Sequence, residues 1–458
     1  MNRDRRSFLA MTAMSGVAAA ALPAKARAAP VPSTAMSQLG LDAAHFGARP
    51  GSPDDQSRVL QRAIDEAARL RAPLALAPGT YRVGDLKLPT GAQLVGVRGA
   101  TRLMLSDGIS LLTASGVEQI SLSGLVLDGV RKRLPERRGL VQLEHCNGVT
   151  LNRCDISGAG GNAVVGIAIQ GELSELNISQ TAEAAIHVLD ARALLLARNS
   201  ISGAGNNGIQ VWRSVAEDDG TFVIDNRIEN IENRSGGSGQ YGNAVNVFRG
   251  ANVMVRGNRI RNCAFSAIRG NAASNFHVES NSISDVREVA IYAEFAFQGA
   301  LIANNSIDGA AFGVSVTNFN EGGRLAVVQG NLIRNLSVKR PAGTDPGDGA
   351  GIGIAVEADA SVTGNVIEGA PSAGIMLGFG HYLRDVAATG NVVRKADIGI
   401  AVSVAPGAGT ALIANNVIAE ARRGAIVGMA KSTPVTGDLA KAGSEQYANL
   451  TLLGNRVR

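Results

Sequence analysis

The phrases Asn258-Arg-Ile260, Asn281-Ser-Ile283 and Asn305-Ser-Ile307 decide the fold, because the same Asn-x-Ile pattern returns along most of the chain. From 258 to 281 is 23 residues, and from 281 to 305 is 24. Related phrases begin at Asn199, Asn226, Asn331, Asn365, Asn391, Asn416 and Asn455. A period of this length is typical of a solenoid, in which each repeat buries its apolar face only when its neighbours stack on it.

A second phrase lies between successive Asn phrases, as in Gly313-Val-Ser-Val-Thr317 and Gly399-Ile-Ala-Val-Ser403. Apolar and variable positions alternate in it, which is the pattern of a strand with one buried face. No helical spacing recurs in the repeats. The pattern therefore predicts an all-β protein, a right-handed parallel β-helix of about a dozen coils, since parallel crossovers are almost always right-handed.

The repeated Asn has a structural explanation in such a fold. Stacked strands lie about 4.8 Å apart, so identical Asn side chains can hydrogen-bond along a ladder. A buried amide left unpaired would cost about 1–3 kcal/mol, whereas a ladder satisfies each amide in turn. We therefore expect an inward-facing Asn ladder and no catalytic role for these residues.

Residues 1–28 have the features of an export signal. Arg5 and Arg6 precede an apolar run from Leu9 to Leu22, and Ala26-Arg-Ala28 is a small-residue cleavage site. The paired arginines resemble the twin-arginine class of signals, and an ordinary secretory signal or an uncleaved anchor are the alternatives. We expect a periplasmic or secreted bacterial protein with no membrane span after signal removal.

The charge of the chain changes when this signal is removed. The full sequence has 44 basic and 39 acidic residues, a net charge of +5 and a pI near 9.3. The expected signal holds five basic residues and one acid, so 44 − 5 = 39 and 39 − 1 = 38, a net charge of +1. This balance gives no support to nucleic-acid binding. Residues 29–44 are predicted to be a linker to a single domain over 45–458.

The start of that domain, about 45–97, is predicted to be an N-terminal cap. Ser52 and Pro53 suit the N-cap and first position of an amphipathic helix, whose apolar stripe includes Leu60 and Ile64. The helix must end before Pro73. Because the open end of a solenoid exposes unpaired edges, we expect this α-helix to cap it.

The order Phe46-Gly-Ala48, Asp54-Asp55, helix and Pro78-Gly-Thr-Tyr81 resembles the N-terminal cap of pectate-lyase-like and polygalacturonase-like β-helices. Together with the signal and the Asn-x-Ile coils, the chain resembles the bacterial family of twin-arginine-translocated repeat proteins in the pectin-lyase-like superfamily. This resemblance covers essentially the whole chain. It implies the fold and export, and that family has no established activity.

The three cysteines, Cys146, Cys154 and Cys263, are an odd number for an oxidising compartment. A long solenoid needs no disulfide, so we expect small buried thiols. A Cys146–Cys154 bridge is the alternative, because the two residues are close within one coil.

The strand phrases also predict which residues point outward. One outward column contains Gln142, Ala168, His187, Gln210, Asn246, Arg269, Tyr292, Ser315, Ala355, Met376 and Ala401. A second contains Glu144, Gln170, Leu189, Trp212, Phe248, Asn271, Glu294, Thr317, Glu357, Gly378 and Ser403. Polar and aromatic side chains gather on the central coils, and small ones follow toward the C-terminus. This distribution predicts a ligand groove over the central coils; aromatics that only pack beneath surface loops are the alternative.

A long groove with aromatic and hydrogen-bonding side chains suits a polysaccharide, and an acidic glycan fits best. The predicted binding residues are His187, Gln210, Trp212, Asn246, Phe248, Asn271 and Glu357. The five histidines are scattered, so neither a metal nor a cofactor is predicted. Calcium bound by carboxylates is an open alternative without support in the sequence. The oligomeric state is not predicted.

Elimination or epimerisation of a uronate needs a base and a group that neutralises the carboxylate. Arg269, Tyr292 and Glu294 supply these residue types on neighbouring coils and are the candidate catalytic residues. A plain ion pair between Arg269 and Glu294 is the alternative. A non-catalytic module that binds an envelope glycan or a protein is the rival function.

Glycoside hydrolysis is a second alternative, and it needs two carboxyl groups. Glu294 and Glu357 share one predicted column. The run Glu217-Asp-Asp-Gly220 is also similar to the paired aspartates of polygalacturonase-like hydrolases, although it lies in an insertion.

Overall fold

The computed structural model describes residues 40–237, 239–345 and 349–458. The predicted export signal, residues 1–28, and the linker up to residue 39 lie outside the described residues. Within the rest of the predicted linker, Leu41 and Asp42 form strand β1, and Ala43–Phe46 form the 3-10 helix η1. No helix in the described part of the chain is long and apolar enough to cross a membrane.

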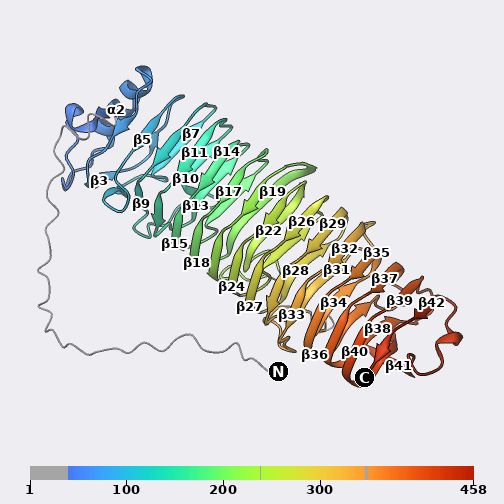
Figure 1. Ribbon diagram of the computed structural model, residues 1–458. Helices are drawn as coiled ribbons and strands as arrows, with labels where there is room; N and C mark the ends of the chain where they lie inside the picture. Colours follow the sequence, from blue (N-terminus) through green and yellow to red (C-terminus); the bar gives the residue numbers. More distant parts are fainter. Residues whose placement is uncertain (1–39, 238, 346–348) are drawn as a thin grey trace, which may run out of the picture.

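The chain winds into an elongated parallel β-helix (Figure 1). Its rungs form a 16-stranded and a 27-stranded sheet. Apart from the β40–β41 hairpin and one isolated bridge, the described pairings are parallel. The prediction of a right-handed parallel β-helix is confirmed, and the solenoid has about 14 turns where the sequence indicated about a dozen. The difference arises because the first coils lack the Asn-x-Ile phrase.

Three rows of strands make up the coils. The 16-stranded sheet contains β1 (Leu41–Asp42), β2 (Leu74–Ala75), β5 (Gln93–Val95), β8 (Ser121–Ser123), β11 (Val149–Asn152), β14 (Gly171–Ser174), β17 (Leu195–Ala197), β20 (Phe222–Ile224), β23 (Met254–Arg256), β26 (Phe276–Glu279), β29 (Gln298–Ala303), β32 (Arg324–Gln329), β35 (Ala358–Thr363), β37 (Arg384–Thr389), β39 (Ala411–Ala414) and β42 (Leu450–Leu453).

The second row follows the Asn positions and belongs to the 27-stranded sheet. It contains β3 (Gly79–Val83), β6 (Thr101–Leu105), β9 (Val126–Asp128), β12 (Asp155–Ser157), β15 (Asn177–Thr181), β18 (Ser200–Ala204), β21 (Arg227–Ile231), β24 (Arg259–Cys263), β27 (Ser282–Val286), β30 (Ser306–Asp308), β33 (Leu332–Arg334) and β43 (Arg456–Val457).

The third row, which we call the functional face, is the other part of that sheet. It contains β4 (Leu86–Lys87), β7 (Leu112–Ser115), β10 (Gly139–Glu144), β13 (Asn162–Ile167), β16 (Ile186–Leu189), β19 (Asn207–Asp218), β22 (Asn243–Ala251), β25 (Ile268–Asn271), β28 (Val289–Glu294), β31 (Phe312–Thr317) and β34 (Ile352–Val356). Three long strands, β36 (Val366–Leu377), β38 (Val392–Ser403) and β40 (Val417–Ala430), continue through both rows, and β41 (Thr433–Asp438) pairs antiparallel with β40.

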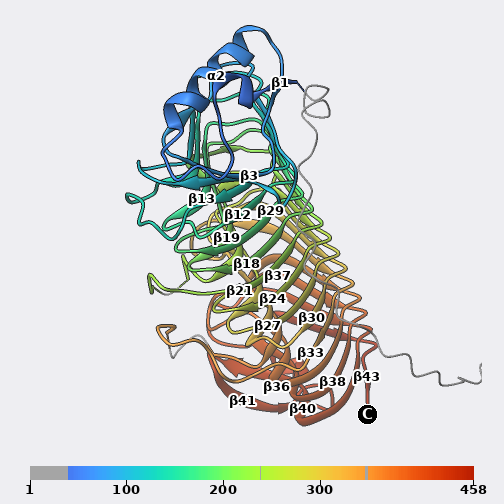
Figure 2. The same cartoon turned by 90° about the vertical axis from the view of Figure 1, so that its left-hand side faces the viewer.

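Helix α2 (Ser57–Arg69) lies at the N-terminal end of the solenoid (Figures 1 and 2). It buries Leu60 and Ile64 as expected. The helix begins at Ser57 and not after Ser52, because Asp55 first forms an isolated parallel bridge with Arg82, and the Gln56 N–H donates to the carbonyl of Arg82 at 2.8 Å. Gln56 is therefore the N-cap residue.

The Asn ladder is confirmed. From Asn226 to Asn416, each side-chain Nδ2 donates to the Oδ1 of the next Asn, at 2.9–3.0 Å, and to a main-chain carbonyl of the previous coil. Each Oδ1 also accepts the main-chain N–H of the Asn before it, as from Asn258 to Asn281 at 3.0 Å. Ladder residues are at most 1% exposed, except the terminal Asn455.

A left-handed residue stands directly before each ladder Asn. Gly257, Gly330 and Gly364 have φ of 68°, 62° and 64°, and Asp225 and Asn304 have φ of 56° and 57°. Gly adopts this conformation freely, and Asp and Asn tolerate it better than other residues. The short turn into each ladder strand therefore depends on these residues.

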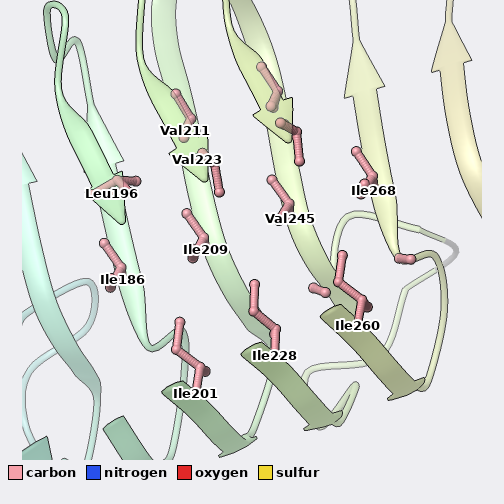
Figure 3. Packing of buried hydrophobic residues seen from close by; sticks show 14 of the residues in the cluster. Ile186, Leu196, Ile201, Ile209, Val211, Val223, Ile228, Val245, Ile260 and Ile268 are labelled. Atoms are coloured by element: carbon pink, nitrogen blue, oxygen red, sulfur yellow. The ribbon is translucent and has the colours of Figure 1, made fainter. Parts of the chain in front are cut away.

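Inside the coils, identical apolar residues stack on one another (Figure 3). Ile201, Ile228 and Ile260 form one such column, paired in register through β18, β21 and β24. Ile186 and Ile209 begin another. The three cysteines are free and buried, as expected, and no disulfide joins them.

Candidate functional site

From His187 onward, the predicted first outward column is confirmed by the strand register. His187, Gln210, Asn246, Arg269, Tyr292, Ser315, Ala355, Met376 and Ala401 pair consecutively along the functional face. The second column pairs from Leu189 through Trp212, Phe248, Asn271 and Glu294 to Thr317.

In one coil, the alternating sequence pattern assigned the wrong residues to the two outward columns. Val165 and Ile167 occupy the columns in place of Ala168 and Gln170. The sequence from Asn162 to Gln170 contains apolar residues in both phases of the alternation, so the pattern alone does not distinguish them. The main chain turns at Ala168, where φ is 50°.

Four predicted binding residues line one cleft of about 860 Å³, which we call the central cleft: His187, Gln210, Trp212 and Phe248. A wall of residues 133–137 precedes β10, and Ser235 and Tyr241 lie in the chain that leads into β22. Asn246 supports the floor by accepting a hydrogen bond from Trp212 Nε1 at 2.8 Å. The structure thus brings five of the seven predicted binding residues together at one site.

The aromatic rings of the cleft floor form a continuous row. The His187 and Trp212 ring centroids are 5.2 Å apart at 87°, and those of Trp212 and Phe248 are 6.1 Å apart at 67°. Such edge-to-face contacts are favourable and hold the rings in place. His187 Nδ1 lies 2.8 Å from Gln210 Oε1. Burial lowers the pKa of His187, and its contact with Gln210 opposes that shift, so this ring is neutral near neutral pH.

Arginines surround this aromatic row, and sequence reasoning missed them. Arg133, Arg137 and Arg249 are exposed residues of the cleft lining. The Arg249 guanidinium lies 4.6 Å from the centroid of the Phe248 ring. These arginines stand outside the alternating columns. The strongly basic segment Arg131–Arg138 is a signal for Arg133 and Arg137 in the sequence, whereas Arg249 has no such signal. The cleft also contains the acids Glu136 and Glu183.

The run Glu217-Asp-Asp-Gly220 does not form a pair of free catalytic acids. Arg213, which is buried, donates to Glu217 at 2.9 Å and lies 3.8 Å from Asp219. The Asp219 carboxylate accepts the main-chain N–H of Thr221 at 3.2 Å. Burial raises the pKa of Asp219, and bonds to Thr221 and the charge of Arg213 oppose that shift. Asp219 therefore stabilises the turn that follows β19.

The three candidate catalytic residues lie together on the coils after the central cleft. Arg269 Nε and a terminal nitrogen donate to the two Glu294 oxygens at 2.7 and 2.9 Å, and Asn271 donates to Glu294 Oε1 at 2.9 Å. The Arg269 guanidinium also lies 5.0 Å from the Tyr292 ring centroid. The ion-pair alternative is therefore what the structure contains, and Glu294 is 1% exposed.

Two further charges that the sequence did not reveal complete this cluster. Glu288 is 2% exposed, accepts a bond from Ser266 at 2.8 Å and lies 3.8 Å from Arg269. Arg340 donates to Glu288 at 3.3 Å. We call Arg269, Glu288, Glu294 and Arg340 the boundary cluster. Neither Glu288 nor Arg340 stands at a column position of the strand phrase.

The boundary cluster limits the chemistry that Tyr292 can perform. Burial raises the pKa of Tyr292 to about 12, with a further contribution from Glu294. A phenol with this pKa stays protonated at neutral pH, so it is not available there to accept a proton from a substrate. Burial lowers the pKa of Arg269, but the charge of Glu294 raises it, and the net shift is upward. Arg269 therefore remains a cation, and its guanidinium is bound to Glu294.

Glu357 lies outside the central cleft. It follows β34 and lines a second pocket toward the C-terminus, together with Tyr292 and Thr317. Its Oε2 accepts the main-chain N–H groups of Asn318 at 2.8 Å and Phe319 at 3.0 Å. Burial raises its pKa, and these two N–H groups oppose the shift. Glu294 and Glu357 thus have different surroundings and different partners.

The described residues contain no group of three or more His, Cys, Asp or Glu side chains that could hold a metal ion. The expectations of no metal and no cofactor stay predictions.

Comparisons with solved structures show similarity in fold alone. Gene product 12 of bacteriophage phi29, in its pre-mature form, gives a TM-score of 0.50 at 13% identity, over 92% of this chain and 72% of that one. The catalytic unit of a GH87 α-1,3-glucanase from Streptomyces thermodiastaticus gives 0.44 at 13%, over 81% and 65%. The A-module of the mannuronan C-5 epimerase AlgE6 from Azotobacter vinelandii gives 0.37 at 16%, over 91% and 99%.

A search of curated protein sequences finds no match. The family model described as "Right handed beta helix region" matches residues 162–323 and 214–393. Together these matches span residues 162–393, which are 393 − 162 + 1 = 232 of the 458 residues and include the central cleft floor and the boundary cluster. The chain belongs to the right-handed β-helix family.

Proposed function

We propose that this protein binds an acidic polysaccharide in the central cleft. The observation that carries the proposal is the fixed row of His187, Trp212 and Phe248, bordered by exposed arginines. Aromatic side chains offer a large rigid contact area at a low entropic cost, and arginines recognise carboxylates through paired hydrogen bonds. A uronate polymer presents both a sugar face and a carboxylate at regular intervals.

The geometry favours binding over catalysis. A uronate lyase or epimerase needs a cation that is free to neutralise the substrate carboxylate. Arg269 instead makes two bonds to Glu294, and a hydrolase could not use Glu294 as a free acid for the same reason. Lyase or epimerase chemistry remains the second candidate, favoured by the position of Tyr292 directly beside Arg269.

Two further proposals concern the ends of the chain. We propose that residues 1–28 direct export through the twin-arginine route, so that the mature protein meets its glycan in the periplasm or outside the cell. We also propose that α2 caps the first coil, since its buried residues Leu60, Ala63, Ile64 and Ala67 lie on the side packed against the solenoid.

The direct test is a binding assay with the mature chain, residues 29–458. Polygalacturonate, polymannuronate and neutral glucans would be compared by affinity gel electrophoresis, while unsaturated products and reducing ends are followed in the same samples. We expect retention by an acidic polymer without product formation. Preferential retention by neutral glucans, or no retention by any glycan, would contradict the proposal.

Two variants assign the binding to the cleft. Trp212→Ala removes the central ring, and we expect an affinity loss of at least about tenfold, which corresponds to about 1.4 kcal/mol. Arg249→Ala should weaken binding most at low salt, because charge screening reduces the contribution of an exposed cation. Phe222→Ala is the matched control, since Phe222 is an exposed aromatic residue on the other sheet. Equal losses in Phe222→Ala and Trp212→Ala would contradict the assignment.

A further inference from the structure

The functional face changes character beyond the boundary cluster. From Val289 onward, the outward positions hold an apolar cluster that is separate from the interior of the coils. Its members are Val289, Phe312, Ile352, Ala355, Ala373, Ile398, Ala401 and Val427, with Tyr292, Met376 and Met429 packed against them. Sheet faces that meet water usually carry polar side chains, so an apolar outer face over six coils indicates a binding surface.

This cluster forms the floor of a pocket with walls, which we call the C-terminal pocket. Its volume is about 380 Å³. Phe379 and Tyr382 form part of one wall, while Met429 and Lys431, where β40 leads into β41, form part of another. Ligand pockets of about 300–1,000 Å³ with mostly apolar linings and a few polar groups are typical of small-molecule sites.

Polar groups line both ends of the pocket. Tyr292 and Thr317 stand on the two coils nearest the central cleft, and Glu357 follows on the next coil, where its Oε2 accepts two main-chain N–H groups. Arg423 and Lys431 line the end that is farthest from the cleft. The apolar floor lies between these ends, and it matches the aliphatic chain of a ligand whose polar head lies toward the cleft.

The two sites are also aligned for a single ligand. Asn246 under the cleft floor pairs with Arg269, and Arg269 pairs with Tyr292 at the pocket entrance. Two coil steps separate Asn246 from Tyr292, which is about 9.6 Å at a spacing of about 4.8 Å per coil. A sugar chain in the cleft could therefore place a substituent in the pocket.

We propose that the C-terminal pocket binds an aliphatic acyl chain carried by the polysaccharide that occupies the central cleft. The inference rests on the proposed function for its glycan part. The acyl part rests on the pocket itself, with Phe312, Met376 and Ile398 contacting the chain, and Tyr292 and Thr317 near the ester group. The natural ligand class is thus an acylated acidic glycan.

The first experiment tests the pocket alone. Octyl β-D-glucoside, below its micelle concentration, would be titrated into the mature protein by calorimetry. We expect saturable binding that weakens at least tenfold in Ala373→Phe, because Ala373 lines the pocket and a phenyl ring there fills it. Met376→Gln, at a half-exposed position, keeps the test valid if Ala373→Phe does not fold. Trp212→Ala should bind the probe as the wild type does.

The second experiment tests the link to the glycan. A polyuronate and its partly octanoylated derivative would be compared with the same variants. We expect the octanoylated polymer to bind about tenfold more tightly. Ala373→Phe should abolish that advantage and Met376→Gln should reduce it, while both leave the affinity for the unmodified polymer unchanged.

Each outcome decides one part of the proposal. Absent octyl glucoside binding, or binding that neither pocket variant weakens, would overturn the pocket. Equal affinity for both polymers would overturn the link to an acylated glycan. Loss of all polymer binding with intact octyl glucoside binding would refute the proposed polysaccharide function and leave the acyl site standing.

Discussion

The central cleft and the C-terminal pocket occupy the same face of the same solenoid and the same columns of the strand register, yet their chemistry is opposite. In the strands of the central cleft, the position two residues before an inward residue holds Asn, namely Asn207 before Ile209 and Asn243 before Val245. In the strands of the C-terminal pocket, the equivalent position holds a large apolar residue, namely Phe312, Ile352 and Ile398 before Val314, Ile354 and Ile400. The strand register is therefore shared, while the side chains at equivalent positions are polar in one region and apolar in the other.

The comparison teaches that inward and outward positions of a β-helix are under separate constraints. Inward positions hold stacked Ile and Val in both regions, such as Ile209 and Val245 in one and Ile354 and Ile400 in the other. Burial of these side chains is worth about 1.5–3 kcal/mol each and does not depend on which ligand the outer face binds. The boundary cluster lies where the two outer surfaces meet.

The largest expected loss of stability comes from removing Arg269 from the boundary cluster. Arg269→Ala leaves the carboxylates of Glu288 and Glu294, both at most 2% exposed, without their shared cation. Removing one partner of a buried ion pair costs about 3–5 kcal/mol. We expect this loss in the free energy of unfolding by chemical denaturation, monitored by circular dichroism.

The double variant Arg269→Met/Glu294→Leu is the control for this prediction. It replaces the pair with apolar residues of similar size, and such replacements are often neutral. Stability close to that of the wild type is expected. If the double variant were as unstable as Arg269→Ala, the packing of the boundary and not its charge would be responsible.

The next effect should be the same in both regions. Asn226→Ala, in the coil of the central cleft strand β22, and Asn391→Ala, near the C-terminal pocket, each remove bonds to a carbonyl and to the next Asn at 2.9–3.0 Å. Each leaves buried groups unpaired, at about 1–3 kcal/mol. We expect matching decreases in thermal stability, and a smaller one for Asn455→Ala at the less buried end of the ladder. A large difference between Asn226→Ala and Asn391→Ala would show that the ladder does not support the two regions equally.

Most of the fold and part of the cleft could be predicted from the sequence. The Asn ladder and the column from His187 to Ala401 follow from strict repetition, because stacked coils place equivalent residues on one another. The aromatic row was found in this way. The arginines of residues 133–137 were not, because loop residues have no repeat to align them, and Arg249 was not, because it lies in β22 outside the two outward columns.

The C-terminal pocket was missed for a different reason. The alternating pattern assigns residues two apart to the same side, so Phe312 and Val314 should both face inward. At the corner before Val314 this rule fails, and Phe312 packs outside with Ile352. Gly353 marks the same corner in the next coil: a Cβ there would lie 2.4 Å from the carbonyl oxygen of Gly374. The Ala and Met residues of the column then looked like a plain surface.

A smaller effect is expected from a substitution that exchanges the residue types of the two regions within one column of the strand register. Gln210 in the cleft and Met376 in the pocket belong to the same column, and Met376→Gln gives the pocket the polar side chain of the cleft. The loss of apolar contact should be about 1 kcal/mol, near the value of one buried methylene. We expect weaker octyl glucoside binding and unchanged thermal stability, measured by calorimetry and by melting. A large loss of stability would indicate that Met376 belongs to the structural core.

The smallest expected effect is a pH dependence confined to the cleft. Burial lowers the pKa of His187, so the unfolded chain binds a proton more readily than the folded one. Stability linked to this residue is therefore present above the ordinary His pKa of about 6.5 and is lost as the pH falls through and below it. His187→Gln removes the titration, so its unfolding free energy should decline less than that of the wild type between pH 7 and pH 5. Phe222→Ala is the control, because Phe222 is an exposed residue on the other sheet without a titratable group, and it should leave the shape of the wild-type pH profile unchanged. Parallel profiles for the wild type and His187→Gln would show that the ring of His187 is not held neutral by the cleft, and the aromatic row would then have to tolerate a cation beside Trp212.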